Sequence, residues 1–260
     1  MQKLYSNKKY IAIFVMPAFI AFLCIGVVPL FITGYYGLFD YNGIGEKTFL
    51  GLKNYIDLFT EDPQFIKAII NSFILAGASL FIQLPISFIL AVTLARGVKG
   101  EGFFRTIYFV VISSMVIGQL FTRSFNSEGL FNGLLGLIGI HTTQAWLADS
   151  STAFIATVVP AVWQSIGYHM LIMYAGIKNI SPDYYEAARI DGATGIKATI
   201  KITLPLLAPV IKMCVTFALV GSLRAFDLIY VMTGGGPNHA SEVPATLMYS
   251  NLFTKGVYGY

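Results

Sequence analysis

Charged residues are scarce in this chain. They make up 12% of its 260 residues, whereas hydrophobic residues make up 56% and the mean hydropathy is +0.70. Because soluble domains carry about 25% charged residues, this shortage indicates an integral membrane protein. The net charge of +4 comes from basic residues spread among loops. No face is therefore predicted to bind nucleic acid.

Residues that build redox and metal sites are also few. The two cysteines, Cys24 and Cys214, both lie inside apolar runs and are too few for a disulfide framework. The three histidines, His141, His169 and His239, are far apart and show no metal-ligand spacing. We therefore expect the chain to hold no metal.

Motifs for catalysis are absent as well. The chain contains no Gly-Lys dipeptide, which a phosphate-binding P-loop requires before its Ser or Thr. It also lacks the G-x-S-x-G, H-E-x-x-H and E-x-x-H patterns. We expect a protein that is not an enzyme and binds no cofactor of its own. If it uses ATP, a separate polypeptide must hydrolyse it.

Long apolar runs predict an all-α fold, a bundle of transmembrane helices. A spanning helix needs about 20 mostly apolar residues. Runs with little or no charge cover residues 10–39, 68–95, 106–122, 150–177 and about 202–227. The first run exceeds the roughly 7–15 apolar residues of a signal peptide, which favours a retained anchor. The sequence therefore predicts five spans.

Basic residues orient these spans. Ten lysines and arginines lie in segments 1–9, 96–105 and 178–201, whereas the alternate segment 40–67 is mainly acidic. Positive loops face the cytoplasm, so the N-terminus and segment 178–201 are predicted to be inside. Residues 124–147, which interleave glycines with Leu and Ile, are too broken for a span. They favour an interfacial or re-entrant helix on the outer side.

A polar segment stands out between the last two spans. Residues 186–209 read EAARIDGATGIKATIKITLPLLAP. Ser181 is placed to cap a helix over 182–191, and Gly192 can adopt the positive φ that ends it. Thr194 is expected to cap a second short helix running into 204. Two short helices joined at a fixed angle would form a rigid elbow that can dock in another protein.

The elbow's sequence resembles the cytoplasmic coupling loop of binding-protein-dependent ABC transporter permeases. The likeness rests on the E-A-A-x-x-D-G-A spacing, on Ile202 to Pro205 and on Pro209. It implies that loop 178–205 contacts the ATPase. The residues that match the motif, or that we assign to the coupling contact, are Glu186, Ala187, Ala188, Asp191, Gly192, Ala193, Leu204 and Pro205. A small pair such as Ala187 and Ala188 would let a partner approach the backbone closely.

Three further segments resemble the sugar permeases of this superfamily, on the side of the first, larger subunit. They are KKYIAIFVMPAFIAF leading into the first span, F-x-G-L-x-N-Y at 49–55 and T-G-G-G-P at 233–237. The resemblance implies one transmembrane domain over 1–260 in a bacterial cytoplasmic membrane. It also implies a sixth span that the given sequence lacks.

The partners that this resemblance implies are a second homologous permease, two cytoplasmic ATPase subunits that bind ATP and Mg²⁺, and an extracytoplasmic solute-binding protein. The cargo would be a sugar or oligosaccharide, and lipid would surround the spans. We expect no nucleic-acid partner.

Polar side chains inside the predicted spans point to a substrate path. Gln164, Ser165 and Tyr168 lie within two turns of the fourth span, and Ser222 lies in the fifth. Polar groups are costly on the lipid face, so they are expected to face the bundle interior. Side chains of this kind also hydrogen-bond between helices. One turn apart, Arg224 and Asp227 are expected to pair with each other.

The resemblance adds detail to this path. Trp163 and Ala225 also fall where maltose-type permeases line their sugar site. Gly221 and Ala225 are smaller than the side chains used there, which argues against maltose and leaves the sugar open. Another small polar solute, such as a polyol phosphate or an amino acid, is the first alternative. A stand-alone secondary carrier is the second, and it would require a buried charged relay.

Overall fold

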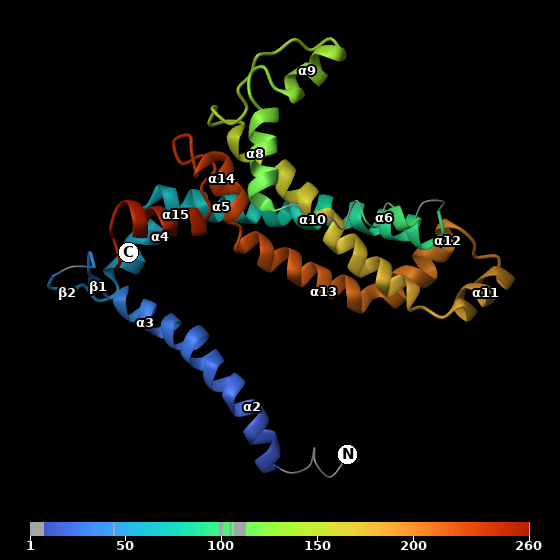
Figure 1. The fold of residues 1–260 in the computed structure, drawn as a ribbon, viewed down its shortest axis with the longest axis horizontal. Coiled ribbons are helices and arrows are strands. Elements are labelled where there is room, and N and C mark those ends of the chain that lie inside the picture. The colour runs from blue at the N-terminus through green and yellow to red at the C-terminus, as the bar shows by residue number, and fades with distance from the viewer. Residues whose placement is uncertain (1–7, 44, 99–100, 104–105, 107–112, 260) are drawn as a thin grey trace. The chain divides into compact units, whose positions relative to one another are not determined.

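The computed structural model describes residues 8–43, 45–98, 101–103, 106 and 113–259. The chain divides into two compact units, one of residues 1–63 with 249–260 and the other of residues 64–248. The described residues are mainly helical, with one short antiparallel pair of strands, β1 (Phe39–Asp40) and β2 (Thr48–Phe49) (Figure 1). The predicted helical class is confirmed.

Four described helical stretches are long and apolar enough to cross a membrane. They are Ala12–Tyr36, Pro63–Ala95, Ala153–Lys178 and Ile196–Thr233. They correspond to four of the five predicted spans. The remaining one, 106–122, runs through residues 107–112, which lie outside the described residues. Helix α8 (Ser114–Ser124) begins within it.

The first unit holds the helices α2 (Lys8–Phe22) and α3 (Val28–Tyr36), joined by the π-helical turn η1 (Leu23–Val27), with α4 (Lys53–Thr60) and the turn η4 (Ser250–Thr254). The side-chain amide of Asn54 lies 3.1, 3.0 and 2.9 Å from the carbonyl oxygens of Gly37, Phe39 and Gly259. One amide thus ties the end of the chain to the loop after α3.

The second unit is built on three long helical stretches. The first runs from α5 (Pro63–Ala78) through the π-helical turn η2 (Ser79–Gln83) into α6 (Leu84–Ala95), and the second is α10 (Ala153–Lys178). The third joins α12 (Ile196–Ala198), the π-helical turn η3 (Thr199–Thr203) and α13 (Leu204–Leu223). Shorter helices lie at one end, namely α8, α9 (Leu130–Leu137), α14 (Asp227–Thr233) and α15 (Pro244–Tyr249) (Figure 1).

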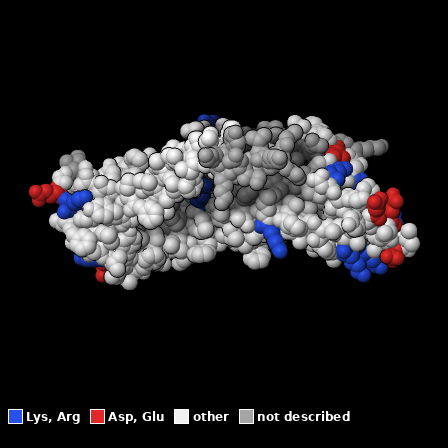
Figure 2. Space-filling model, turned by 90° about the horizontal axis from the view of Figure 1, so that it is seen from below, with Lys and Arg blue, Asp and Glu red and all other residues white. Residues whose placement is uncertain are grey.

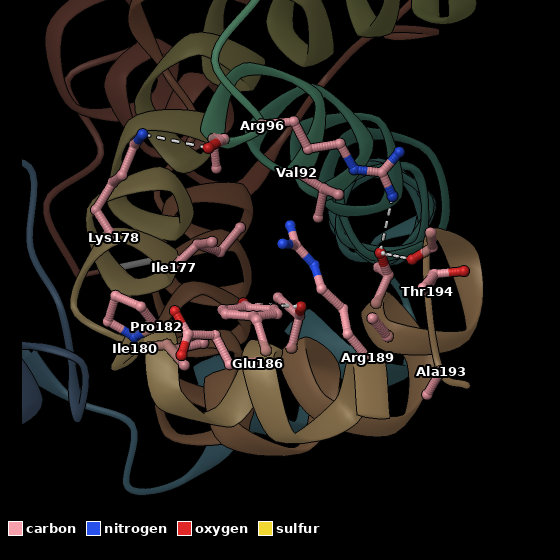
Figure 3. Close-up of a pocket in the computed structure, with 16 residues that line it drawn as sticks. Val92, Arg96, Ile177, Lys178, Ile180, Pro182, Glu186, Arg189, Ala193 and Thr194 are labelled. Atoms are coloured by element: carbon pink, nitrogen blue, oxygen red, sulfur yellow. Dashed lines mark hydrogen bonds between the residues drawn. The ribbon is translucent and has the colours of Figure 1, made fainter. Parts of the chain in front are cut away.

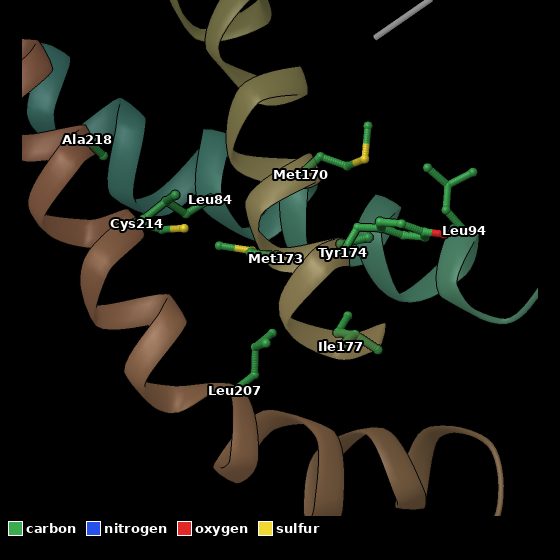
Figure 4. Packing of buried hydrophobic residues seen from close by; sticks show 10 residues of the cluster. Leu84, Leu94, Met170, Met173, Tyr174, Ile177, Leu207, Cys214 and Ala218 are labelled. Carbon is green, nitrogen blue, oxygen red and sulfur yellow. The ribbon is translucent and has the colours of Figure 1, made fainter. Parts of the chain in front are cut away.

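Helices α6, α10 and α13 pack around one apolar cluster (Figure 4). Met170, Met173, Leu207 and Cys214 are almost fully buried in it. Lipid tails are as apolar as leucine, so such a cluster holds helices together by close packing and not by escape from water. Gly176 allows α10 and α13 to approach closely, since a Cβ there would lie 2.6 Å from Leu207 Cδ1.

Three of the π-helical turns directly precede a helix whose second residue is proline. Pro29, Pro85 and Pro205 follow η1, η2 and η3 in this way. Proline has no N–H, and its ring clashes with the carbonyl four residues earlier. A locally widened turn relieves that clash without breaking the helix. The spans therefore continue through their prolines.

The start of the last span differs from the prediction. Its helix begins at Ile196 and continues into α13, so no separate short helix ends at 204. The N-cap is Gly195, with φ +58°, and no side chain caps it. The prediction of a Thr194 cap was wrong. Glycine occupies the N-cap position because its backbone conformation, with positive φ, is strained for other residues.

Candidate functional site

Helix α11 (Pro182–Ile190) forms the predicted elbow at the end of α10. Ser181 caps it, as predicted, by accepting a hydrogen bond from the Asp183 N–H at 3.3 Å. Beyond its last turn, Gly192 has φ +73°. The Ala193 N–H donates to the Ala188 carbonyl at 2.8 Å, and the Gly192 N–H to that of Arg189 at 3.1 Å. These two bonds define a Schellman motif, so the exit angle from α11 is fixed by backbone geometry.

The two faces of α11 differ. Residues Pro182, Tyr185, Glu186 and Arg189 line a hollow between α11 and the ends of α6, α10 and α12 (Figure 3). Ile190, whose side chain is 89% exposed, is absent from that lining. This exposed apolar side chain therefore lies on the part of α11 that does not face the hollow.

The predicted coupling residues do not all lie together. Glu186 and Ala193 line the hollow, whereas Ala187 is exposed and does not line it. Ala188 is only 5% exposed, so it packs inside this chain. Asp191, the C-cap of α11, is exposed. Leu204 and Pro205 are also exposed, at the start of α13.

A side-chain bond ties α11 to the last span. The Tyr185 hydroxyl lies 3.0 Å from the Thr203 hydroxyl in η3. Sequence analysis missed both residues, and the only available signal was that two hydroxyl side chains flank the glycine turn. With the Schellman motif, this bond connects α11 to the following span at two separate points.

A second hollow, of about 360 Å³, lies within the helical bundle of the second unit. All four predicted path residues line it: Gln164, Ser165, Tyr168 and Ser222. Gln164 exchanges hydrogen bonds with Ser114 of α8, its amide donating to the hydroxyl oxygen at 3.1 Å. The structure therefore brings together residues that are up to 58 positions apart in the sequence, 164 to 222.

Helices α5 to α6 supply polar lining residues that sequence analysis missed. Ser79 and Gln83 both line the second hollow and belong to η2. The Gln83 side chain, 2% exposed, lies 2.8 Å from His169 Nδ1, and the Ser79 hydroxyl lies 3.1 Å from that of Ser222. The signal was available, since Ser79, Gln83 and Ser87 recur every four residues in an otherwise apolar run. π-Helical turns often occur at functional sites.

Two expectations about this region were wrong. Trp163 does not line the hollow, and its ring lies 5.9 Å from that of Phe121. Arg224 and Asp227 both line it but form no ion pair, and the only ion pair of the described part of the chain joins His239 and Glu242. The reason is a break in the helix. Arg224 is the C-cap of α13 and Asp227 begins α14, so their side chains are no longer one helical turn apart.

In the turn before α10, the described part of the chain holds a carboxyl group with a shifted pKa. The Asp149 carboxylate accepts hydrogen bonds from the Ser151 N–H at 2.8 Å, the Ser151 hydroxyl at 2.7 Å and the Gln144 amide at 2.9 Å. These donors stabilise the charged form and hold the pKa of Asp149 below its usual value of 3.8. The group thus fixes the turn that precedes α10.

The fold and its two hollows define a class: a multi-pass membrane protein with a polar cavity between its helices and a rigid elbow beyond the spans. The family described as "Binding-protein-dependent transport system inner membrane component" matches residues 5–254. The chain belongs to this family.

Individual relatives agree with that family. The chain is 40% identical to the probable ABC transporter permease protein YurN of Bacillus subtilis over 98% of this chain and 89% of the relative. It is 33% identical to the trehalose/maltose transport system permease protein MalF of Thermococcus litoralis, over 98% and 87%. These matches make it an ABC transporter permease and a membrane component.

Two solved structures share the fold. A chain of a bacterial alginate ABC transporter, in complex with an alginate pentasaccharide-bound periplasmic protein, aligns over 100% of this chain and 88% of that one, with a TM-score of 0.80 and 24% identity. A second structure, of a bacterial ABC transporter involved in the import of alginate, gives a TM-score of 0.78 over 100% and 90%, with 25% identity.

Proposed function

We propose that this chain is a membrane-spanning subunit of a bacterial importer that carries a sugar or oligosaccharide across the cytoplasmic membrane. It does no chemistry itself. ATP and Mg²⁺ bind two separate cytoplasmic subunits, a second permease completes the path, and an extracytoplasmic binding protein delivers the solute. The excess of basic residues in segments 1–9, 96–105 and 178–201 supports a cytoplasmic N-terminus and a cytoplasmic elbow.

The second hollow carries the sugar assignment. Its lining combines amides and hydroxyls with the aromatic rings of Tyr168, Phe217 and Phe226. Sugars bind such mixtures, because hydroxyl groups need hydrogen-bond partners while ring faces pack on aromatic surfaces. The volume of about 360 Å³ lies at the lower end of the range for small-molecule sites. One of the relatives, the trehalose/maltose transport system permease protein MalF, is named for cargo of this class.

Uptake into proteoliposomes tests the sugar assignment. The chain is reconstituted with its partner subunits and internal ATP, and entry of labelled mono- and oligosaccharides is measured. Gln164→Leu should raise the KM of the transported sugar at least several-fold, because one hydrogen-bonding group is lost from the hollow. Trp163→Leu is the matched control on the neighbouring residue, outside the hollow. Equal effects of the two variants would contradict this substrate path.

An acidic or phosphorylated solute is the second candidate. Arg224 lines the hollow without an acidic partner within ion-pair distance among the described residues. A solute carboxylate or phosphate could bind this guanidinium. Competition decides between the two: uptake blocked by a uronic acid or sugar phosphate, but not by the neutral sugar, would favour the anion. Transport in liposomes without ATP would instead favour a secondary carrier.

The coupling role is assigned to α11. Ile190 and Ala187, which do not line the first hollow beside α11, are proposed to contact the ATPase. Gly192 and the Tyr185–Thr203 bond are proposed to make α11 rigid enough to transmit the motion of the ATPase. Ile190→Asp should release the ATPase during co-purification, because it puts a charge into an apolar contact. Leu137→Asp in α9, at a side chain 83% exposed, is the matched control. If the ATPase stays bound to the Ile190 variant, α11 is not the docking element.

A joint substitution of Glu186 and Gly192 tests coupling separately from docking. Uptake should fall while the binding protein captures its solute normally. Unchanged uptake and unchanged ATPase stimulation would reject the coupling assignment.

A further inference from the structure

The first hollow, between α11 and the ends of α6, α10 and α12, is lined by more positive charge than the coupling role explains. Its volume is about 660 Å³, and its lining includes Arg96, Lys178 and Arg189 but only one carboxylate, that of Glu186. None of these groups forms an ion pair within the described part of the chain. Figure 3 shows the guanidinium of Arg189 pointing into the middle of the hollow, with Arg96 and Lys178 at its edge.

The surrounding contacts place the cations without neutralising them. Arg96 donates to the Thr199 hydroxyl at 3.0 Å, and Lys178 to the Ala95 carbonyl at 3.2 Å. These neutral acceptors orient the two side chains while leaving their charges uncompensated. Three cations from three different elements therefore converge on one concave site, as in protein sites for phosphate groups.

The location of the hollow favours a lipid over a soluble anion. Arg96 caps the end of α6, and Lys178 is the last residue of α10, so both cations sit where spans leave the membrane. Apolar side chains of Val92, Ile177 and Ile180 line the same hollow. A ligand that bears a phosphate together with hydrocarbon fits both parts of this lining.

The surface around the hollow agrees with this position. Figure 2 shows blue and red side chains gathered at the end formed by α11 and α12, whereas most of that face is uncharged. With the elbow in the cytoplasm, the hollow would open at the inner leaflet, where anionic lipids concentrate. Basic pockets between spans on this side of a membrane bind such headgroups.

We propose that this hollow binds the phosphate headgroup of an anionic phospholipid of the inner leaflet. Arg189 and Arg96 bind the phosphate, Lys178 adds to the positive field, and the acyl chains lie against the apolar lining. The lipid would fill the space between α11 and the ends of the spans and hold the elbow from its membrane side. The site is independent of the cargo, so it can stand or fall separately from the sugar assignment.

Lipid titration of the assembled transporter tests the proposal. The complex is placed in nanodiscs of phosphatidylcholine with about 25% phosphatidylglycerol, and retained phosphatidylglycerol is counted by native mass spectrometry. The double variant R96Q/R189Q should retain phosphatidylglycerol at least about tenfold more weakly, since each basic contact contributes about fivefold. The matched control K197Q/K201Q removes two exposed cations of the same loop that do not line the hollow, and it should bind like the wild type.

A conservative variant and a phosphate-binding experiment distinguish a bound lipid from a soluble anion or an acidic protein surface. R96K/R189K keeps the charge and should retain most of the lipid, which distinguishes loss of binding from loss of folding. Equal lipid retention in R96Q/R189Q and the wild type would overturn the proposal. Binding of inorganic phosphate in pure phosphatidylcholine nanodiscs, with displacement of the lipid, would assign the site to a soluble anion instead. If R96Q/R189Q loses the ATPase subunit but not the lipid, the hollow accepts an acidic protein surface and the lipid assignment fails.

Discussion

The elbow and the polar hollow of the bundle are built by different kinds of interaction. The elbow is specified locally, since Ser181, Gly192 and Gly195 set its helix ends through their own backbone positions. The polar hollow is assembled from side chains of α5–η2, α8, α10, α13 and α14. A local device can be recognised in the sequence and damaged by one backbone change. A single segment shows only part of a tertiary site, and because many side chains share its lining, one substitution there should have a smaller effect.

The largest effect is expected from Gly192→Val. A residue other than glycine costs about 1–2 kcal/mol in the left-handed region, and a β-branched residue is worse there. We expect uptake to fall about tenfold or more, because the direction of the chain after α11 changes. Gly192→Asn should be milder, since asparagine tolerates this conformation.

Gly77→Val is the matched control for that variant. A Cβ at Gly77 meets nothing within 4 Å, and its φ is not positive. Uptake by the control should remain close to wild type. If both valine variants transport equally well, the elbow does not depend on its glycine.

The next effect concerns the packing between the two sites. Gly176→Val would place side-chain atoms against Leu207 and Val210, where a Cβ alone already approaches within 2.6 and 3.1 Å. Overpacking of this kind costs about 1–3 kcal/mol. We expect a lower thermal unfolding temperature of the purified complex. Gly133→Ala, at a position with open space, should leave that temperature unchanged.

A smaller effect is expected from Gln83→Leu. This change removes the partner that lies 2.8 Å from His169 Nδ1, yet that nitrogen is also 3.0 Å from the Ser165 carbonyl. Polar contacts between spans contribute about 0.6 kcal/mol on average, so the complex should remain folded. The KM for the solute should rise, because the hollow loses one amide. A change in stability with no change in KM would make Gln83 a structural residue only.

The smallest effect is expected at Asp149, a second local device. Its pKa lies below 3.8, so its stabilising contribution is complete above about pH 3.8 and is lost as the pH falls through the lowered pKa. Hydrogen exchange of the Ser151 amide, corrected for intrinsic rates, should therefore rise in acid. Asp149→Asn should remove that pH dependence. A wild-type turn that is equally protected at every pH would contradict the assignment.

The expectations that failed were local predictions that the tertiary structure overruled. The cap of the last span was assigned to Thr194 because Thr is a common cap, but the path of the chain required positive φ and therefore Gly195. Arg224 and Asp227 were expected to pair on the assumption of one continuous helix, and the break between α13 and α14 separates them. In each case the choice between two reasonable local structures depended on packing elsewhere.

The sequence by itself determined the membrane class, the four spans that lie within the described residues and the helix of the elbow. Hydropathy, loop charge, a capping serine and a glycine are local properties that need no knowledge of distant residues. Only the tertiary structure decided that Gln83 meets His169, that Ala188 points inward while Ile190 points out, and that three cations surround one hollow. Those facts depend on the rotation and depth of each helix, which packing at close contacts such as Gly176 sets.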